Sequence, residues 1–258
     1  MEPGNTDDGE APDAQDLANI EKIKALLKSK SGNDTQKFAG LALLRSVLDN
    51  SPRLQANTQV VYDLWASMDG KFVSRLIKTG SKPASKGAEK DDSKSSMLQL
   101  GVSVLHTFAV LLPETALGES KFTDRIPALI PALLHTSDAD GTTETLLQLL
   151  LSVASTEEGA RAILSVEDLS PLTEMAPANP KALDILRFAF LNIMGRRADE
   201  DVDFAAIRKR VDEKVQSLTA SFKGTDAVTY LGFLGSLLRQ ADSRVSKETE
   251  SGMYRSNS

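Results

Sequence analysis

The 258-residue chain contains no cysteine. This absence excludes disulfide bonds, thiolate metal sites and a thiol nucleophile. Histidine is nearly as scarce, since only His106 and His135 are present, and neither has a second histidine at ligand spacing. We therefore expect no metal site and no cofactor. We interpret His106 as a packed or groove-lining side chain, and His135 as a residue that ends a helix, where the helix dipole favours a cation.

Glycine motifs for phosphate binding or nucleophilic catalysis are also missing. No two glycines lie two residues apart and none lie four apart, which excludes a GxGxxG loop and a GxSxG elbow. Gly4 and Gly9 have the spacing of a P-loop, but Glu10 follows where that loop needs lysine. We therefore predict that the chain is not an enzyme and has no catalytic residues, and an enzyme with an unrecognised site is the least favoured hypothesis.

Long apolar runs and aromatic residues are few. The run at 108–112 is far shorter than the ~20 residues that span a bilayer. Aromatic residues make up 5% of the chain and hydrophobic residues 41%, a balance that suits stacked helices rich in Leu and Ala. The acidic, polar start is unlike a signal peptide. These features predict a cytoplasmic protein without an integral membrane segment.

Charge is concentrated at the start of the chain. Residues 1–16 contain six acidic residues and no basic ones, which accounts for the whole net charge of −6, so the remainder is neutral. A neutral body provides no field that attracts nucleic acid, and we expect no nucleic-acid partner. We interpret residues 1–16 as a disordered acidic tail, with a binding segment as the alternative.

A helical domain is predicted over residues 17–241, followed by a frayed polar end at 242–258. The domain is interrupted by a Lys/Ser-rich insert at 79–95, in which lysines recur every four residues from Lys82. Gly80, Pro83 and Gly87 would break a helix there, so we interpret the insert as a mobile surface loop. A phosphorylation site or a basic docking strip is the alternative.

The stretch from Thr156 to Gly195 has the pattern of three consecutive helices, the length of one armadillo or HEAT repeat. Residues 155–158 (STEE) form a capping-box pattern, and Asn179-Pro180 predicts the start of the long third helix. A similar triplet precedes it at an offset of 43 residues. The pattern predicts an all-α, armadillo/HEAT-like right-handed superhelical solenoid of about four to five repeats. A helical bundle with coincidental spacing is the alternative.

Residues 188–193 (FAFLNI) resemble the armadillo pattern Trp-Ala-Leu-Ser-Asn-Ile, in which the Trp and Asn line a groove and the Asn holds a peptide backbone. The resemblance implies a partner-binding groove at Phe188, Asn192 and the equivalent residues Ser103, Thr107, Gln148 and Ser152. These four lack the Trp and Asn, which favours the alternative of polar groups on an exposed inner face. Arg187, which lies mid-helix, either binds a partner carboxylate or forms an internal ion pair.

Longer stretches resemble the neurochondrin family: residues 20–50, 71–80, 97–114 and 122–135. The resemblance implies an armadillo-like cytosolic protein without enzymatic activity, linked in animals to neurite outgrowth, kinase signalling and membrane association. Family members are longer, so we expect a missing C-terminal part. Their membrane association is attributed to acylated cysteines, which this chain lacks. We predict a scaffold that binds partner proteins of unknown identity. The alternative is a regulatory or carrier subunit in nuclear transport or membrane trafficking.

Overall fold

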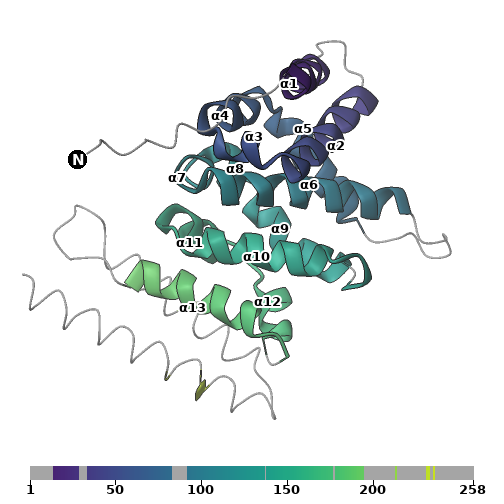
Figure 1. The fold of residues 1–258 in the computed structure, drawn as a ribbon. Coiled ribbons are helices and arrows are strands. Elements are labelled where there is room, and N and C mark those ends of the chain that lie inside the picture. Colours follow the sequence, from purple (N-terminus) through teal and green to yellow (C-terminus); the bar gives the residue numbers. More distant parts are fainter. Residues whose placement is uncertain are drawn as a thin grey trace, which may run out of the picture. The chain divides into compact units, whose positions relative to one another are not determined.

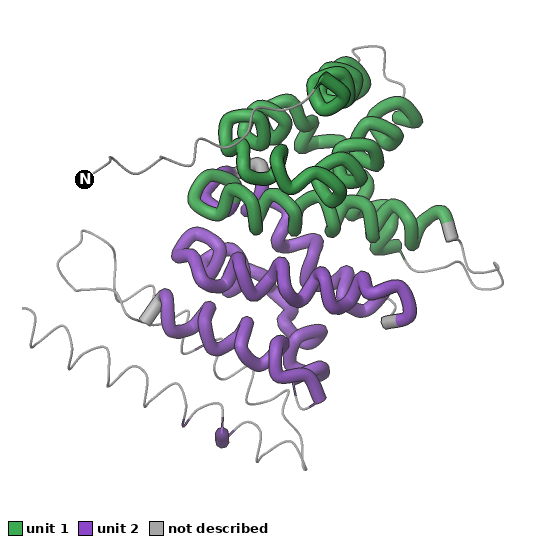
Figure 2. Tube along the Cα trace, in the orientation of Figure 1, with its two compact units in different colours: residues 1–116 green, residues 117–258 purple. Residues whose placement is uncertain are grey.

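The structure is a computed structural model that describes residues 14–28, 34–82, 92–136, 138–176 and 178–194, and the single positions 213, 231, 232 and 235. Every regular element within these ranges is a helix (Figure 1). This all-helical structure is compatible with an α-solenoid. Most of the predicted acidic tail and the whole of 242–258 lie outside the described residues. The chain divides into two compact units, residues 1–116 and 117–258 (Figure 2).

Unit 1 holds the helices α1 to α7. Their bounds are Ala14–Leu27 (α1), Asp34–Asn50 (α2), Pro52–Ala56 (α3), Thr58–Ser67 (α4), Gly70–Gly80 (α5), Asp92–Leu111 (α6) and Pro113–Ala116 (α7). The helix α1 packs against α2, and α5 packs against α6. At the centre of the core, the fully buried rings of Trp65 and Phe108 lie 5.1 Å apart between centroids and tilted by 55°, a favourable aromatic geometry.

Prolines and polar caps set the helix boundaries in unit 1. As the sequence predicts, α2 ends before Pro52, which becomes the first residue of α3. The apolar spacing predicts one helix over 54–68, but the structure divides this stretch at Asn57. The Oδ1 atom of Asn57 accepts a hydrogen bond of 3.1 Å from the backbone N–H of Val60, and so caps α4. The capping hydrogen bond at Asn57 therefore sets the helix boundary, although the apolar pattern continues across it.

Glycine allows the close approach of α5 to α6. A Cβ atom at Gly80 would lie 2.6 Å from the Cβ of Leu98 and 2.8 Å from the carbonyl oxygen of Lys94. At Gly101 it would lie 3.1 Å from a side-chain carbon of Ile77. Both ends of the predicted 79–95 insert are helical, since α5 continues to Gly80 and α6 begins at Asp92. Residues 83–91 lie outside the described part of the chain.

Unit 2 holds the remaining helices. Their bounds are Ser120–Thr123 (α8), Ile126–Ala132 (α9), Thr142–Ala154 (α10), Glu157–Leu164 (α11), Ser170–Met175 (α12) and Pro180–Met194 (α13), with 3₁₀ turns at Leu133–His135 (η1) and Asp138–Asp140 (η2). The helix α9 starts at Ile126 and gives way to η1 just after Pro131, near the bend that the sequence predicts at this proline. Helices are also predicted at 201–222 and 227–241; of these stretches the structure describes only the single positions 213, 231, 232 and 235.

Three helices over 156–195 are confirmed as α11, α12 and α13, and the last is the longest with 15 residues. The predicted capping box is wrong by one residue. Thr156 is the N-cap, its hydroxyl accepting from the N–H of Gly159 at 3.1 Å, so Glu158 is not at the N3 position. The start of α13 is as predicted, because Oδ1 of Asn179 accepts from the N–H of Lys181 at 3.0 Å.

Candidate functional site

The helices α10 and α13 of unit 2 pack side by side and run parallel (Figure 1). Near their N-terminal ends Lys181 donates to Glu144, a residue 37 positions earlier. At their C-terminal ends Nδ2 of Asn192 donates to the carbonyl oxygen of Ala154, 38 positions earlier, at 2.6 Å. The two contacts have nearly the same residue offset, as expected for two helices that run parallel with the same rise per residue.

These two helices carry five of the seven predicted groove residues. We call the surface they form the α10–α13 face; it comprises Glu144, Gln148, Ser152, Lys181, Arg187, Phe188 and Asn192. Glu144 on α10 links the two helices, because its Oε1 atom accepts a hydrogen bond from Lys181 on α13. The same atom accepts from Nε2 of Gln148 on α10 at 2.9 Å. The hydroxyl of Ser152 donates to the carbonyl oxygen of Gln148 at 3.2 Å. Several of the polar groups on this face are thus engaged within the chain.

Arg187 takes part in an internal ion pair. Its Nη2 atom lies 2.8 Å from Oδ1 of Asp184, one helical turn earlier, and its guanidinium carbon lies 5.2 Å from the centroid of the Phe188 ring. Its Nε atom is buried and makes no hydrogen bond within the described part of the chain. The internal ion pair offered as one alternative is therefore present, and binding of a partner carboxylate stays a prediction.

Asn192 ties two helices together. Its Nδ2 atom donates to the carbonyl oxygen of Ala154, the last residue of α10 and one of the carbonyls that a helix end leaves without an intrahelical partner. In the armadillo pattern the equivalent Asn uses its amide for a bound peptide. Here the NH₂ group already has an acceptor inside the chain, and the peptide-holding role stays a prediction.

The other two predicted groove residues lie on α6, in unit 1. Ser103 is buried, with 7% of its surface exposed, and its carbonyl oxygen accepts the Thr107 hydroxyl at 3.0 Å. Between them, His106 is half-buried, and loss of solvation lowers its pKa below 6.5. His106 therefore favours the neutral form in the folded chain. The structure thus leaves Thr107 as the more accessible of the two groove positions.

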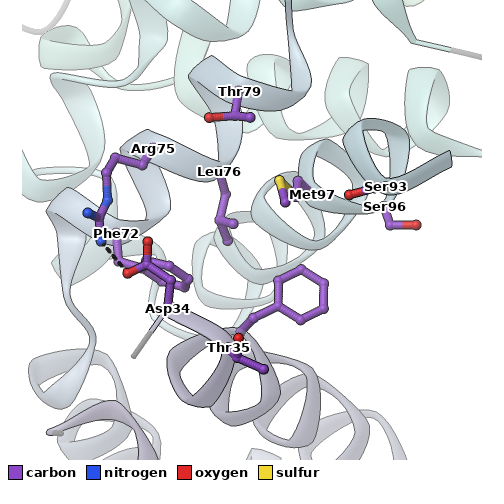
Figure 3. Close-up of a pocket in the computed structure, with 10 residues that line it drawn as sticks. Asp34, Thr35, Phe72, Arg75, Leu76, Thr79, Ser93, Ser96 and Met97 are labelled. Carbon is purple, nitrogen blue, oxygen red and sulfur yellow. Dashed lines mark hydrogen bonds and ion pairs between the residues drawn. The ribbon is translucent and has the colours of Figure 1, made fainter. Parts of the chain in front are cut away.

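A cleft that sequence reasoning missed lies in unit 1, between α2, α5 and the start of α6. Its volume is about 570 Å³. Figure 3 shows the side chains that line it. The lining residues are Asp34, Thr35, Phe38, Phe72, Arg75, Leu76, Thr79, Ser93, Ser96 and Met97. We call it the α2–α5–α6 cleft. Because the three helices are separated in the sequence, no local motif predicts the cleft, which forms only through tertiary packing.

Charged pairs surround Phe72 beside this cleft. Arg75 donates from Nη2 to Oδ1 of Asp34 at 2.8 Å, and the Lys37 ammonium lies 2.7 Å from Oδ2 of Asp69. Both cations lie within cation–π range of the Phe72 ring, Arg75 at 5.4 Å and Lys37 at 6.0 Å from its centroid. The ring therefore packs beside two cations while remaining almost fully buried.

Asp69 is the N-cap of α5. Burial alone would raise the pKa of its carboxyl group, but hydrogen bonds from Lys37 and from the N–H groups of Phe72 and Lys71, with the charge of Lys37, together lower it. A lowered folded pKa means that the contribution to stability is present above the ordinary value of 3.8 and is lost as the pH falls through the folded value. The start of α5 is therefore held through the neutral range.

The exposed face of α5 is entirely basic. We call Lys71, Arg75 and Lys78, together with Lys82 two residues after the end of α5, the basic row; the residues are four, three and four positions apart, and all four are exposed. The opposite side of the helix is buried, through Phe72, Val73, Leu76 and Ile77. The spacing was visible in the sequence. The signal was missed because Lys82 was assigned to the insert and not to the row that begins at Lys71.

Two kinds of feature are absent from the described part of the chain. None of the helices there is long and apolar enough to cross a membrane. No cluster of three or more His, Asp or Glu side chains in the same ranges has the arrangement to hold a metal ion. The fold and these surfaces define an all-helical protein compatible with an α-solenoid.

The comparisons with known proteins give the family. A model described as Neurochondrin matches residues 15–254, most of the chain. The chain therefore belongs to the neurochondrin family, which confirms the resemblance found in the sequence. No curated protein and no solved structure matches it.

Proposed function

We propose that this chain is a non-catalytic scaffold that binds partner proteins across the α10–α13 face. The observation that carries the proposal is the parallel pairing of α10 with α13, fixed at both ends by Lys181–Glu144 and Asn192–Ala154. A pair fixed in this way presents half-exposed polar and aromatic groups at constant spacing. Rigid presentation lowers the ordering cost of binding. Membership of the neurochondrin family supports a scaffold-type role.

The binding chemistry of this face centres on Arg187 and Phe188. The guanidinium carbon lies 5.2 Å from the centroid of the ring, so the two half-buried side chains offer a cation and an aromatic ring next to each other. Arginine and aromatic residues are the types enriched where binding energy concentrates. Asp184 already pairs with Arg187, so a partner carboxylate would compete with a weak intrahelical ion pair.

Proximity labelling with the full chain in its native cell, followed by binding of the purified candidates, tests the proposal. The variant Arg187→Glu with Gln148→Ala is expected to lose the partner. Arg161→Glu is the matched control, because it reverses a charge in the same unit and also breaks an intrahelical ion pair, with Glu157. Equal binding by the double variant and the control would exclude this face. Turnover of a substrate by the purified chain would contradict the non-catalytic role.

A further inference from the structure

Among the described residues, the basic row has no counter-charge for most of its length. No carboxylate in the described ranges pairs with Lys71, Lys78 or Lys82, whereas Arg75 pairs with Asp34. Within α5 the row covers the seven residue steps from Lys71 to Lys78, or roughly 10 Å at the helical rise of 1.5 Å per residue, and Lys82 follows two residues after the helix ends. Four like charges on one face repel one another, and this repulsion is relieved when an anionic partner binds.

The α2–α5–α6 cleft lies beside this row and shares Arg75 with it. Its lining combines apolar side chains, such as Leu76 and Met97, with hydroxyl groups such as Ser93 (Figure 3), and Phe38 also lines it. A volume of about 570 Å³ is at the scale of small-ligand pockets. An apolar side chain entering the cleft would therefore place the segment that carries it along the basic row.

We propose that the basic row and the α2–α5–α6 cleft together bind an acidic amphipathic helix of a partner protein, with one bulky apolar side chain in the cleft. A helix presents carboxylates three and four residues apart on one face, which is the spacing of the row. The inference rests on the proposed scaffold function and names a second surface for it, together with the chemistry of the partner.

A membrane surface fits the same charges less well. Helices that lie on a bilayer bury exposed apolar side chains next to their basic residues. The large apolar side chains of α5 are instead buried in unit 1, with Phe72, Val73, Leu76 and Ile77 each no more than 4% exposed. A cleft beside the row adds a site for one discrete side chain, which a bilayer does not supply. The peptide is therefore the favoured occupant.

Fluorescence anisotropy with the purified full chain tests the proposal. The probe is a labelled Ala-rich helical peptide with Glu residues three and four apart on one face and a single Phe beside them. Lys71→Glu with Lys78→Glu is expected to weaken its binding about ten-fold or more. Each substitution removes an exposed attraction to a carboxylate of the peptide and replaces it with a repulsion. Binding by the wild-type chain is expected to weaken as salt is added.

The control is Lys22→Glu, an exposed lysine on α1 of the same unit that pairs with no carboxylate in the described ranges. It should leave the affinity unchanged. Ser93→Trp fills the cleft from an exposed position. It is expected to weaken the Phe probe several-fold and to leave a probe with Ala in place of Phe unaffected. Circular dichroism of each variant confirms that the helices remain.

Three results would overturn the proposal: no binding of the probe to the wild-type chain, equal weakening by Lys22→Glu, or equal binding by all variants. Sedimentation with phosphatidylserine vesicles forms a separate arm. Vesicle binding that is lost with Lys71→Glu and Lys78→Glu, without binding of the Glu probe, would assign the row to a membrane surface and overturn the peptide. The α10–α13 variants leave the basic row intact, so failure of one proposal is distinguishable from failure of the other.

Discussion

The two candidate surfaces differ in how they use their polar groups. On the α10–α13 face of unit 2, Gln148, Lys181 and Asn192 all donate to acceptors within the chain. On α5 of unit 1, Lys71 and Lys78 are exposed and pair with no carboxylate in the described ranges. The comparison teaches that resemblance to a binding motif located Asn192, which holds two helices together, whereas the lysines without a paired carboxylate in the described ranges lie where no motif pointed.

The largest difference in stability between the two units is expected when a buried aromatic residue is removed. Trp65→Ala should lower the free energy of unfolding by about 3–5 kcal/mol, because Trp65 is fully buried against Phe108 and leaves a large cavity. Denaturation followed by circular dichroism gives the loss, and hydrogen exchange shows whether unit 1 loses more protection than unit 2. Tyr62→Ala on the same helix is the control, since Tyr62 is 44% exposed. A loss equal to that control would contradict the packing of α4 against α6.

The tight crossing in unit 1 gives the next effect. Gly80→Ala should cost roughly 1–3 kcal/mol, because its Cβ would lie 2.6 Å from the Cβ of Leu98 and 2.7 Å from its backbone nitrogen. Thermal unfolding measures the cost. Gly232→Ala is the control, since a Cβ there meets no atom of the described residues within 4 Å. Equal stability of the two variants would show that α5 and α6 do not approach this closely.

In unit 2 the corresponding test is the contact between helices. Asn192→Ala should cost about 1 kcal/mol, the net worth of one hydrogen bond, because the carbonyl oxygen of Ala154 loses its donor. Chemical denaturation measures it. Asn50→Ala removes an exposed bond within a single helix, to the carbonyl oxygen of Ser46, and should cost less. A stable Asn192→Ala variant that has lost a bound partner would instead favour the armadillo-like peptide role.

The smallest effect is a dependence on pH confined to unit 1. Burial lowers the pKa of His106 below 6.5, so near that value the unfolded chain binds more protons than the folded chain. The stability contributed by the neutral imidazole is therefore present above pH 6.5 and is lost as the pH falls below it. Unfolding measured at several pH values should show this slope in the wild-type chain and a weaker one in His106→Gln. An unchanged slope would mean that His106 is not desolvated.

Much of the fold was predictable because local signals carry it. Pro52 and the pair Asn179-Pro180 mark helix boundaries by removing or supplying single hydrogen bonds, which the sequence states directly. The division at Asn57 and the shift of the cap to Thr156 were missed because neighbouring residues compete for the same role. Boundaries of this kind depend on small energy differences between adjacent caps.

The candidate sites were less predictable, since they depend on residues that are distant in the sequence. The acceptor of Asn192 lies 38 residues earlier, and no spacing rule names it. The cleft needs Phe38, Thr79 and Met97 from three helices. The basic row was the exception, because the period of α5 places its lysines on one face in the sequence itself. The row was nevertheless not predicted, because the predicted insert begins at residue 79 and so separates Lys82 from Lys71, Arg75 and Lys78.

The contacts at the two ends of α10 and α13 have a further consequence. A slide of one helix along the other by a single turn would break the contact to Glu144 and the contact to Ala154 together. The pair therefore has one register, and each position on α10 has a constant counterpart on α13. A partner that contacted both Gln148 and Phe188 would therefore meet the two side chains at a fixed separation.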